Sequence, residues 1–326
     1  MEEKIAELFD EAVRRHVSDI YLLPSTEGYE ISFSIASAYV RYQKISVSDA
    51  QHFINFLKFK GDMALSERRR PQLGAWVWEY EGEQIFCRFS CVGTFLNYET
   101  MVIRLIYSNF TNGGGYFFDE QFKEIEQACQ KKGLIVFAGP MGSGKTTAMY
   151  HFAKKLRGKL VMTIEDPVEI YEPQFLQLQV NNKALMSYEN LLTAALRLHP
   201  DVFVIGEIRN ETTAAIALRA ALSGHLVLST VHAQSVYGVF FRLLNLGTSK
   251  FDLTQILQLV SYQRLIETTH DDVKVLFDIL SLEKTSWDEI SQMKRGEMTD
   301  DWGKRLEQCE RYGEITSEIR QKYLQG

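Results

Sequence analysis

The residues best suited to chemistry lie in a glycine-rich segment near the middle of the chain. Residues 139–146 read Gly-Pro-Met-Gly-Ser-Gly-Lys-Thr, which fits the phosphate-binding pattern G-x-x-x-x-G-K-[S/T]. Glycines let the backbone curl so that its N–H groups point at phosphate oxygens, and a helix that begins there adds the positive end of its dipole. Lys145 can reach the β- and γ-phosphates of a nucleoside triphosphate, and the Thr146 hydroxyl can ligate Mg²⁺. The residues predicted to contact the nucleotide are Gly139, Pro140, Met141, Gly142, Ser143, Gly144, Lys145, Thr146 and Thr147.

The segments on either side have the character that such a loop needs. Residues 134–138, Leu-Ile-Val-Phe-Ala, form a short apolar run that is typical of a buried strand. Residues 147–156 contain no Gly or Pro, and Gly158 follows as a candidate helix stop. The sequence therefore predicts a strand, the glycine loop and a helix in that order. The alternative is an ordinary glycine-rich turn.

Titratable residues recur after the glycine loop, each beside a further apolar run. They are Glu165, Glu169, Glu207, His225 and His232. In an open parallel sheet, functional side chains gather at the strand ends. Glu207 could polarise a water molecule or hold a metal-bound water, or it could be no more than a charge at a helix N-terminus. An acidic turn such as the one that holds Glu165 is by itself usually a solvated loop, and a lone histidine is more often structural than catalytic.

Composition limits the classes of protein to consider. The chain has 326 residues, of which 45% are hydrophobic and 24% charged, and its net charge is −6. These values are ordinary for a soluble protein of two domains, and the acidic balance argues against a broad nucleic-acid surface. The longest apolar runs fall well short of a membrane span, and the acidic start Met-Glu-Glu-Lys is unlike a signal peptide. The four cysteines contain no Cys-x-x-Cys pair, so we expect a reduced, cytosolic protein without structural zinc.

The first part of the chain, residues 1–108, reads as a small α+β domain with an antiparallel sheet. We expect Pro24 to stop its first strand and a capping box at 48–51 to begin its second helix. The expected elements are a helix over 5–13, strands over 20–23, 29–35, 76–78, 85–90 and 101–107, and a helix from the capping box to Gly61.

A different alternation follows in the rest of the chain. Residues 109–116, which include Gly113-Gly114-Gly115, read as a linker, with a plain surface loop as the alternative. In residues 117–326, apolar runs alternate with helical stretches, which predicts a parallel sheet wrapped by helices. The stretch after about residue 282 is charged and helix-prone, and it suggests no chemistry. The predicted strands are 134–138, 160–164, 202–205 and 226–229, and the predicted helices include 187–198 and 212–222.

Taken in their order, these segments resemble the secretion ATPases of type II secretion, type IV pili and competence pili. Residues 5–280 carry the resemblance, and the Walker B stretch ends in Gly206-Glu207 where the family usually has Asp. The similar segments are 139–147 (Walker A), 163–169 (aspartate box), 198–209 (Walker B), 224–232 (histidine box), and 18–20 and 67–72 in the N-terminal half.

The resemblance implies an α/β fold class: a RecA-like P-loop NTPase domain with a parallel sheet, preceded by a smaller α+β domain of PAS-like type. It implies a homo-oligomer, usually a hexameric ring, in which ATP and Mg²⁺ bind between the two domains. Turnover would drive a polytopic membrane platform protein. The protein would then be cytoplasmic and peripheral at the inner face of the plasma membrane, without direct contact with nucleic acid.

The resemblance also implies roles for the candidate residues. Glu207 would be the general base, and Glu165 and Glu169 would organise metal and water. His232, together with His225, would sense the γ-phosphate or position water. The metal ligands implied are Thr146, Glu165 and Glu207.

Two arginines of the N-terminal half, Arg88 and Arg104, fall at strand positions where the family supplies charges that complete the site. The alternative for each is an exposed strand charge. Residues 30–35 carry no arginine where the family strand is Arg-rich, and Gln72-Leu73-Gly74-Ala75 replaces the usual Gln-Asp-Gly-Arg. The zinc cysteines, the long N-terminal extension and the C-terminal segment of retraction motors are absent. These departures favour a member that assembles a competence pilus.

Three other functions stay open at this level. The first is a retraction or secretion motor of the same family. The second is a nucleotide-bound scaffold with weak turnover, which the lost charges at Leu73 and Ala75 would suit. The third is a metabolic P-loop kinase, although the chain offers no recognisable pocket for a substrate to be phosphorylated.

Overall fold

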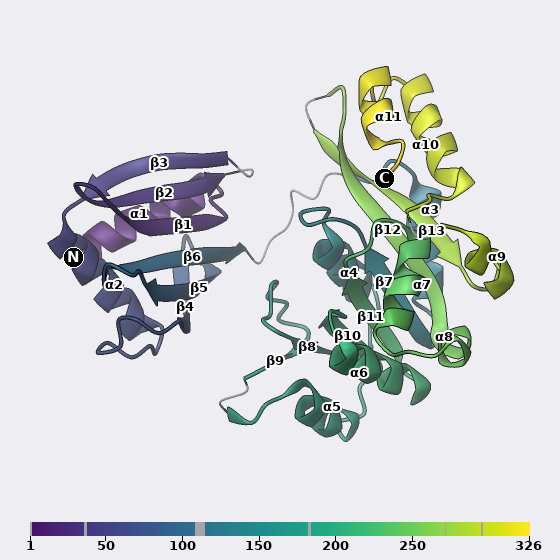
Figure 1. Cartoon of the computed structure of the whole chain (residues 1–326), viewed down its shortest axis with the longest axis horizontal. Helices are drawn as coiled ribbons and strands as arrows, with labels where there is room; N and C mark the ends of the chain where they lie inside the picture. The colour runs from purple at the N-terminus through teal and green to yellow at the C-terminus, as the bar shows by residue number, and fades with distance from the viewer. Residues whose placement is uncertain (1, 36–37, 108–114, 182–183, 271, 295) are drawn as a thin grey trace. The chain divides into compact units, whose positions relative to one another are not determined.

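The structure is a computed structural model of the chain, and it describes residues 2–35, 38–107, 115–181, 184–270, 272–294 and 296–326 (Figure 1). Two compact units divide the chain, Met1–Asn109 and Phe110–Gly326. The predicted linker, residues 109–116, falls mostly on residues 108–114, which lie outside the described residues. The domain limits 1–108 and 117–326 therefore stay a prediction.

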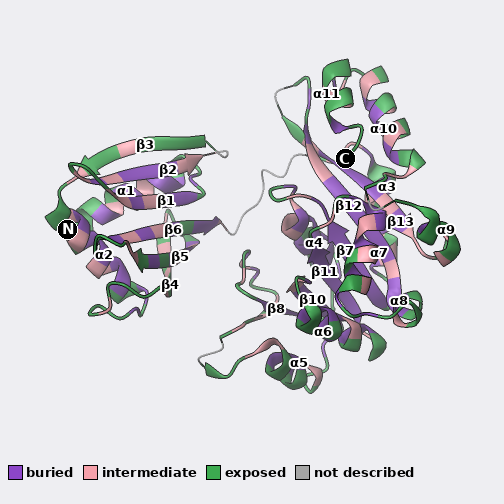
Figure 2. Ribbon diagram, viewed as in Figure 1, coloured by how far each residue is buried: buried purple, intermediate pink, exposed green. Residues whose placement is uncertain are grey.

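The first unit is a six-stranded antiparallel sheet whose strands follow the order β3-β2-β1-β6-β5-β4. Both helices of this unit share one hydrophobic core with the inward faces of the strands, so the opposite face of the sheet carries the more exposed residues (Figure 2). The elements are α1 (Glu2–Arg14), β1 (Asp19–Ser25), β2 (Gly28–Ile35), β3 (Ala38–Ile45), α2 (Val47–Lys60), β4 (Gln72–Tyr80), β5 (Glu83–Gly93) and β6 (Glu99–Tyr107).

Where the sequence pattern of this unit is regular, the predicted faces are confirmed. Cys87 and Cys91 lie on the buried face of β5 with Phe89 between them, so they pack as small apolar side chains. The predicted stripe of α1 is buried at every position: Ile5, Leu8, Phe9, Ala12 and Val13.

Two predicted boundaries in the first unit are wrong. Helix α2 begins after Ser46, whose hydroxyl accepts a hydrogen bond from the N–H of Asp49 at 3.0 Å, so the capping residue lies two positions before the predicted Ser48. Strand β1 also continues through Pro24. Strand β6 pairs with β1 only as far as Leu22, so Pro24 has a strand neighbour on one side alone, where a missing N–H is tolerated.

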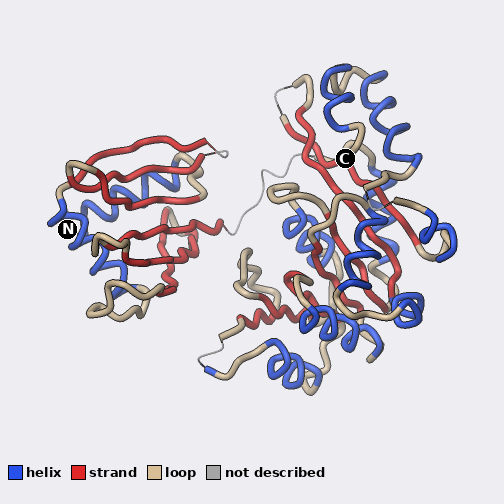
Figure 3. Tube along the Cα trace, viewed as in Figure 1, coloured by secondary structure: helices blue, strands red, loops and turns tan. Residues whose placement is uncertain are grey.

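The second unit combines a sheet with helices (Figure 3). Its seven strands follow the order β13-β12-β7-β11-β10-β8-β9 and are parallel except for β13. Successive residues of β7 point to opposite faces of the sheet and belong to different core clusters. Helices therefore cover both faces. The strands are β7 (Gly133–Ala138), β8 (Val161–Glu165), β9 (Leu176–Gln179), β10 (Val202–Glu207), β11 (Leu226–Val231), β12 (Leu257–Glu267) and β13 (Val273–Ser281). The helices are α3 (Asp119–Ala128), α4 (Lys145–Lys154), α5 (Tyr188–Leu196), α6 (Glu211–Leu222), α7 (Val236–Asn245), α8 (Lys250–Ile256), α9 (Trp287–Gln292), α10 (Asp300–Arg311) and α11 (Ser317–Tyr323).

All four apolar runs predicted as parallel strands are strands of this sheet, which confirms the fold class. Helix α4 ends at Lys154, before the predicted stop at Gly158, because the next residues form tighter turns. Strand β12 was not predicted. It follows α8 without a turn residue, and its interior contains Ser261 and Gln263, polar side chains that are fully buried.

The charged stretch after residue 282 forms helices α9, α10 and α11. Helix α10 packs against β13, and α10 and α11 lie side by side (Figure 1). Trp302 of α10 is buried, and its indole N–H donates to the carbonyl oxygen of Tyr323 at 2.9 Å. Asp278 of β13 accepts hydrogen bonds from the hydroxyl of Thr299 and, at 3.1 Å, from its backbone N–H. These helices are therefore part of the core of the second unit. No helix among the described residues is long and apolar enough to cross a membrane.

Asp278 should make the stability of this unit depend on pH. Burial raises the pKa of its carboxyl from 3.8 to about 6, and the hydrogen bonds from Thr299 offset this only in part. The folded state therefore binds the proton more tightly than the unfolded state, and stability is lost as the pH rises between these two values. We expect the free energy of unfolding of the wild type to fall by about 2 kcal/mol more than that of Asp278→Asn between about pH 4 and pH 7. Urea unfolding across this range measures the difference, and parallel curves would contradict the prediction.

Candidate functional site

The glycine loop lies where β7 ends and α4 begins, as the sequence predicts. Gly139, Gly142 and Gly144 have φ angles of 146°, 76° and 80°, in the region that favours glycine. A Cβ atom on Gly139 would lie 2.5 Å from the carbonyl oxygen of Gln263, so no larger residue fits at this position. Gln263 of β12 also donates from its side-chain amide to the carbonyl oxygen of Ser143 at 2.7 Å. The neighbouring strand thus fixes the curl of the loop.

Lys145, the first residue of α4, folds back over this loop. Its Nζ donates to the carbonyl oxygens of Gly139 at 3.0 Å and Pro140 at 2.8 Å. Burial lowers the pKa of the ammonium group, while the charges of Glu207 and Glu169 raise it in part. The side chain is therefore a buried cation that lies within the field of two carboxylates.

The rest of the loop offers donors suited to phosphate. Ser143 is buried, and its Oγ has no hydrogen-bond partner among the described residues. A phosphate oxygen would satisfy such a hydroxyl. Thr147 follows in the first turn of α4, and Met141 projects into solvent with 88% of its surface exposed. These residues fit the phosphates of a nucleotide.

Thr146 and Glu169 form the part of the site that suits Mg²⁺. The Thr146 hydroxyl donates to Oε2 of Glu169 at 2.9 Å, so the two oxygens could face one cation. Within the described residues, no group of three or more His, Cys, Asp or Glu side chains could hold a metal ion. At phosphate sites, Mg²⁺ takes one or two protein ligands and completes its shell with phosphate oxygens and water. The oxygens present fit that mode, and the set Thr146, Glu165 and Glu207 stays a prediction.

Glu165 ends β8 and is buried. It accepts a hydrogen bond from the hydroxyl of Tyr150 at 2.5 Å, and Gln177 donates to the same hydroxyl at 2.8 Å. Burial first, and then the charge of Glu165, raises the pKa of Tyr150 far above its usual value, so the phenol stays a donor. Helix α4 and strand β9 therefore hold this carboxylate in one orientation.

Glu207 ends β10 beside Glu165 and His232. A Cβ atom on Gly206 would lie 3.0 Å from Cγ of Glu165, so glycine lets these two strand ends approach closely. Nε2 of His232, which follows β11, lies 3.7 Å from Oε1 of Glu207. Both side chains are partly exposed, at 49% for His232 and 36% for Glu207, so water can reach the pair. A partly hydrated carboxylate with a histidine neighbour can accept a proton from water.

His225 does not join this group. It precedes β11, and Leu226 pairs with Gly133 at the start of β7, whereas the glycine loop follows Ala138 at the other end. Its Nδ1 lies 3.2 Å from the carbonyl oxygen of Ala220, and its ring packs edge-on against Phe203. His225 thus lies at the N-terminal end of β11, whereas Lys145 lies beyond the C-terminal end of the neighbouring β7, so His225 is not part of the site that we propose.

Arg88 and Arg104 belong to the first unit. They are paired directly across β5 and β6, so both point away from the core, and Nε of Arg104 donates to Oδ1 of Asp19 at 2.8 Å. Like charges directly opposite in a sheet repel, and the carboxylate of Asp19 offsets part of that cost. Their place in a nucleotide site between the two units stays a prediction.

Comparison with known proteins gives the family. The family model described as "Type II/IV secretion system protein" matches residues 1–311. The chain belongs to this family. A competence protein ComGA from Streptococcus pneumoniae is 39% identical over 267 residues, which is 82% of this chain and 85% of that protein. A second ComGA, from Bacillus subtilis, is 33% identical over 279 residues, 81% of this chain and 76% of that protein.

A solved structure supports the fold. The pilus retraction motor PilT with bound ADP has a TM-score of 0.73 at 22% identity, and the likeness covers 97% of this chain and 95% of that one. At this identity the likeness speaks for the fold alone. The predicted α/β architecture, with a RecA-like unit after a smaller N-terminal one, is confirmed, while its PAS-like description stays a prediction.

Some residues of the site were not singled out from the sequence. Arg209 forms an ion pair with Asp166, and this pair links the segment that follows β10 to the segment that follows β8. Arg242 of α7 donates to the carbonyl oxygen of Arg209 at 3.0 Å. Gln263, which donates to the carbonyl oxygen of Ser143 in the glycine loop, was also not singled out. The charge that follows β10 was the sequence signal for Arg209, whereas Arg242 lies inside α7 and Gln263 inside β12, where no local pattern marks them.

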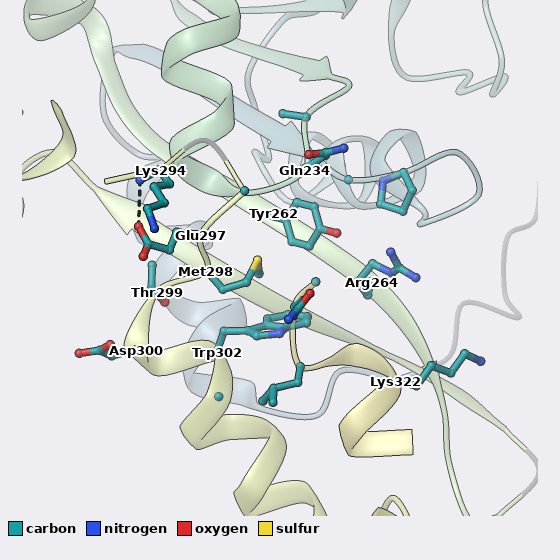
Figure 4. A pocket seen from close by; sticks show the side chains of 18 of the residues that line it. Gln234, Tyr262, Arg264, Lys294, Glu297, Met298, Thr299, Asp300, Trp302 and Lys322 are labelled. Carbon is teal, nitrogen blue, oxygen red and sulfur yellow. Dashed lines mark hydrogen bonds between the residues drawn. The ribbon is translucent and has the colours of Figure 1, made fainter. Parts of the chain in front are cut away.

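A cavity of about 1360 Å³ opens beside the glycine loop of the second unit (Figure 4). Gly139, Pro140 and His232 line one part of it. Figure 4 shows Tyr262 of β12 close to Met298 and Trp302, and Arg264 of the same strand also lines the cavity. The C-terminal helices therefore form one wall of the space that adjoins the glycine loop.

Proposed function

We propose that this secretion ATPase hydrolyses ATP with Mg²⁺ and is an assembly motor for a competence pseudopilus used in DNA uptake. One observation carries the proposal: Lys145 lies in a glycine loop and in the field of Glu207 and Glu169. The names of the ComGA relatives support the competence assignment. The platform protein of the pilus machinery is the proposed membrane partner.

The proposed chemistry divides between the two sides of the reacting phosphate. Lys145 and the N–H groups of the loop bind the β- and γ-phosphates and neutralise charge as the γ-phosphoryl group leaves. Thr146 and Glu169 would hold Mg²⁺, and the ion would neutralise part of the charge on the phosphates. Glu207 accepts the proton of the attacking water, and His232 orients that carboxylate or the water. The γ-phosphoryl group is thereby transferred to water, leaving ADP and phosphate.

Glu165 has a supporting part in this proposal. It is held by Tyr150 and lies against Gly206, so it fixes the strand end that carries Glu207. Arg88 and Arg104 would complete the site from the N-terminal unit and stabilise charge in the transition state. A hexameric ring would let each ATP turnover move one unit against the other. The motor would work in the cytoplasm at the inner face of the membrane, without contacting DNA itself.

DNA uptake tests the competence assignment. In the bacterium that carries this chain, deletion should abolish transformation, because no force would assemble the pseudopilus. The wild-type chain should restore it, Glu207→Gln should not, and Glu211→Gln, the same chemical change at the exposed start of α6, should behave as the wild type. Transformation frequency is the measurement. A deletion strain that transforms normally but loses secretion or pilus retraction would contradict the assignment and favour another motor of the family.

A further inference from the structure

Two loops of the first unit are joined where β5 ends. The N–H of Gly93 donates to the carbonyl oxygen of Arg69 at 3.2 Å. A Cβ atom on Gly93 would lie 2.4 Å from the carbonyl oxygen of Arg68, so only glycine allows this approach. The turn between β5 and β6 and the loop before β4 are thereby held in contact. We call the side chains of Arg68, Arg69, Arg70, Phe95 and Leu96 on these loops the Arg–Phe surface.

The apolar part of the Arg–Phe surface is the tip of a tight turn. The N–H of Asn97 donates to the carbonyl oxygen of Thr94 at 3.0 Å, and Asn97 has a φ of 63°. Phe95 and Leu96 are therefore the two central residues of the turn, where polar residues are usual. They are 88% and 60% exposed. A rigid turn thus presents two large apolar side chains to solvent.

The basic part of the Arg–Phe surface stands on a rigid loop. The Glu67 carboxylate accepts hydrogen bonds from the backbone N–H groups of Arg69 at 2.8 Å and Arg70 at 3.0 Å. The carbonyl oxygen of Glu67 accepts a hydrogen bond from the ammonium of Lys58. Lys58 is buried, and its Nζ also donates to Oε1 of Glu99 at 2.6 Å. This network fixes the backbone, and the three guanidinium groups extend from it.

The three arginines keep most of their charge available to solvent. Arg68, Arg69 and Arg70 are all exposed. Nε of Arg70 lies 3.6 Å from Oε2 of Glu67, and 86% of the Arg70 side chain stays accessible. This ion pair therefore neutralises little of the Arg70 charge. A chain with a net charge of −6 therefore concentrates three consecutive positive charges beside an exposed apolar tip.

We propose that the Arg–Phe surface binds an anionic phospholipid membrane. Phe95 and Leu96 enter the boundary between headgroups and acyl chains, and the arginines contact the negative headgroups. The shape favours lipid over an acidic protein segment: peptides dock in grooves or on strand edges, whereas these apolar side chains project from a convex tip. The inference goes beyond the proposed motor function and needs no nucleotide.

Vesicle co-sedimentation with the full chain tests this. The wild type should bind vesicles of phosphatidylcholine mixed with phosphatidylglycerol, and it should bind vesicles of phosphatidylcholine alone far more weakly. Changing Arg68, Arg69 and Arg70 together to Gln should weaken binding on the order of a hundredfold, at about fivefold for each basic residue. Phe95→Ser with Leu96→Ser should also weaken it and leave the remaining binding more sensitive to salt.

Matched controls separate this surface from general charge and hydrophobicity. The triple change of Lys4, Arg157 and Arg311 to Gln removes the same charge elsewhere, and Phe251→Ser removes a phenylalanine that is 71% exposed. Both should bind as the wild type does. Lys145→Ala should also bind, since the inference is independent of ATP turnover. Thermal unfolding of each variant shows that the chain is folded.

Two outcomes would overturn the inference. One is a wild type that ignores anionic vesicles at low salt, or variants of the Arg–Phe surface that bind as well as their controls. The other is a chain that ignores vesicles but is retained on an immobilised acidic peptide through Arg68, Arg69 and Arg70. That result would assign the surface to a protein partner.

Discussion

Glu207→Gln is expected to lower kcat for ATP hydrolysis on the order of a hundredfold to ten-thousandfold and to leave nucleotide affinity almost unchanged. Glutamine has the same shape but cannot take a proton from water. The side chain ends a buried strand, and 36% of it is exposed beside His232, so the change should leave packing intact. Steady-state hydrolysis and binding of a fluorescent ATP analogue measure the two quantities.

Glu211→Gln is the matched control for this change, because it neutralises an exposed carboxylate four positions away at the start of α6. It should hydrolyse ATP as the wild type does. A Glu207→Gln variant with full activity would remove Glu207 from the role of general base. Equal losses of binding and turnover would instead indicate a structural role.

Lys145→Ala should weaken nucleotide binding and slow hydrolysis, because the ammonium would contact phosphate in the ground state as well as in the transition state. Loss of a hydrogen bond to a charged group costs about 1.5–3 kcal/mol in binding, and loss of a charge-stabilising donor lowers kcat on the order of a hundredfold to a thousandfold. Among the residues that the structure describes, the ammonium donates hydrogen bonds to Gly139 and Pro140 of its own loop, so the change should leave the rest of the fold intact. Calorimetric titration with ATP and the hydrolysis assay test both effects.

Lys155→Ala provides the control for the lysine change. Lys155 is the C-terminal cap of the same helix, where it contacts the ring of Phe122 and the carboxylate of Glu126 near the surface. It should bind and hydrolyse ATP normally, since surface contacts of this kind contribute little. Wild-type affinity in Lys145→Ala would show that the glycine loop does not bind the phosphates in the proposed way.

The local parts of the site could be predicted from the sequence because the signals for them are local. The curl of the loop follows from Gly139, Gly142 and Gly144, and Lys145 follows from their spacing. Glu207 could be placed because a continuous apolar run before it identifies a parallel strand, and such strands end at one edge of the sheet.

The rest depends on tertiary contacts that a sequence pattern does not encode. Gln263 reaches the glycine loop from β12, a strand whose buried polar residues break the apolar pattern. His225 and His232 flank the same run, yet a strand has two ends, and only His232 lies at the end near Lys145. The sequence predicted the cap of α2 at Ser48 and not at Ser46, because Ser48 offers the same chemistry two residues later.

The central claim is that Lys145 and Glu207 belong to one site that hydrolyses ATP, and a single assay tests it most directly. That assay is phosphate release by the wild type, Lys145→Ala and Glu207→Gln over a range of protein concentrations, with and without the platform protein. We predict that the wild type turns over ATP at least about a hundredfold faster than either variant. A wild type as slow as both variants under every condition would contradict the motor and favour a nucleotide-bound scaffold.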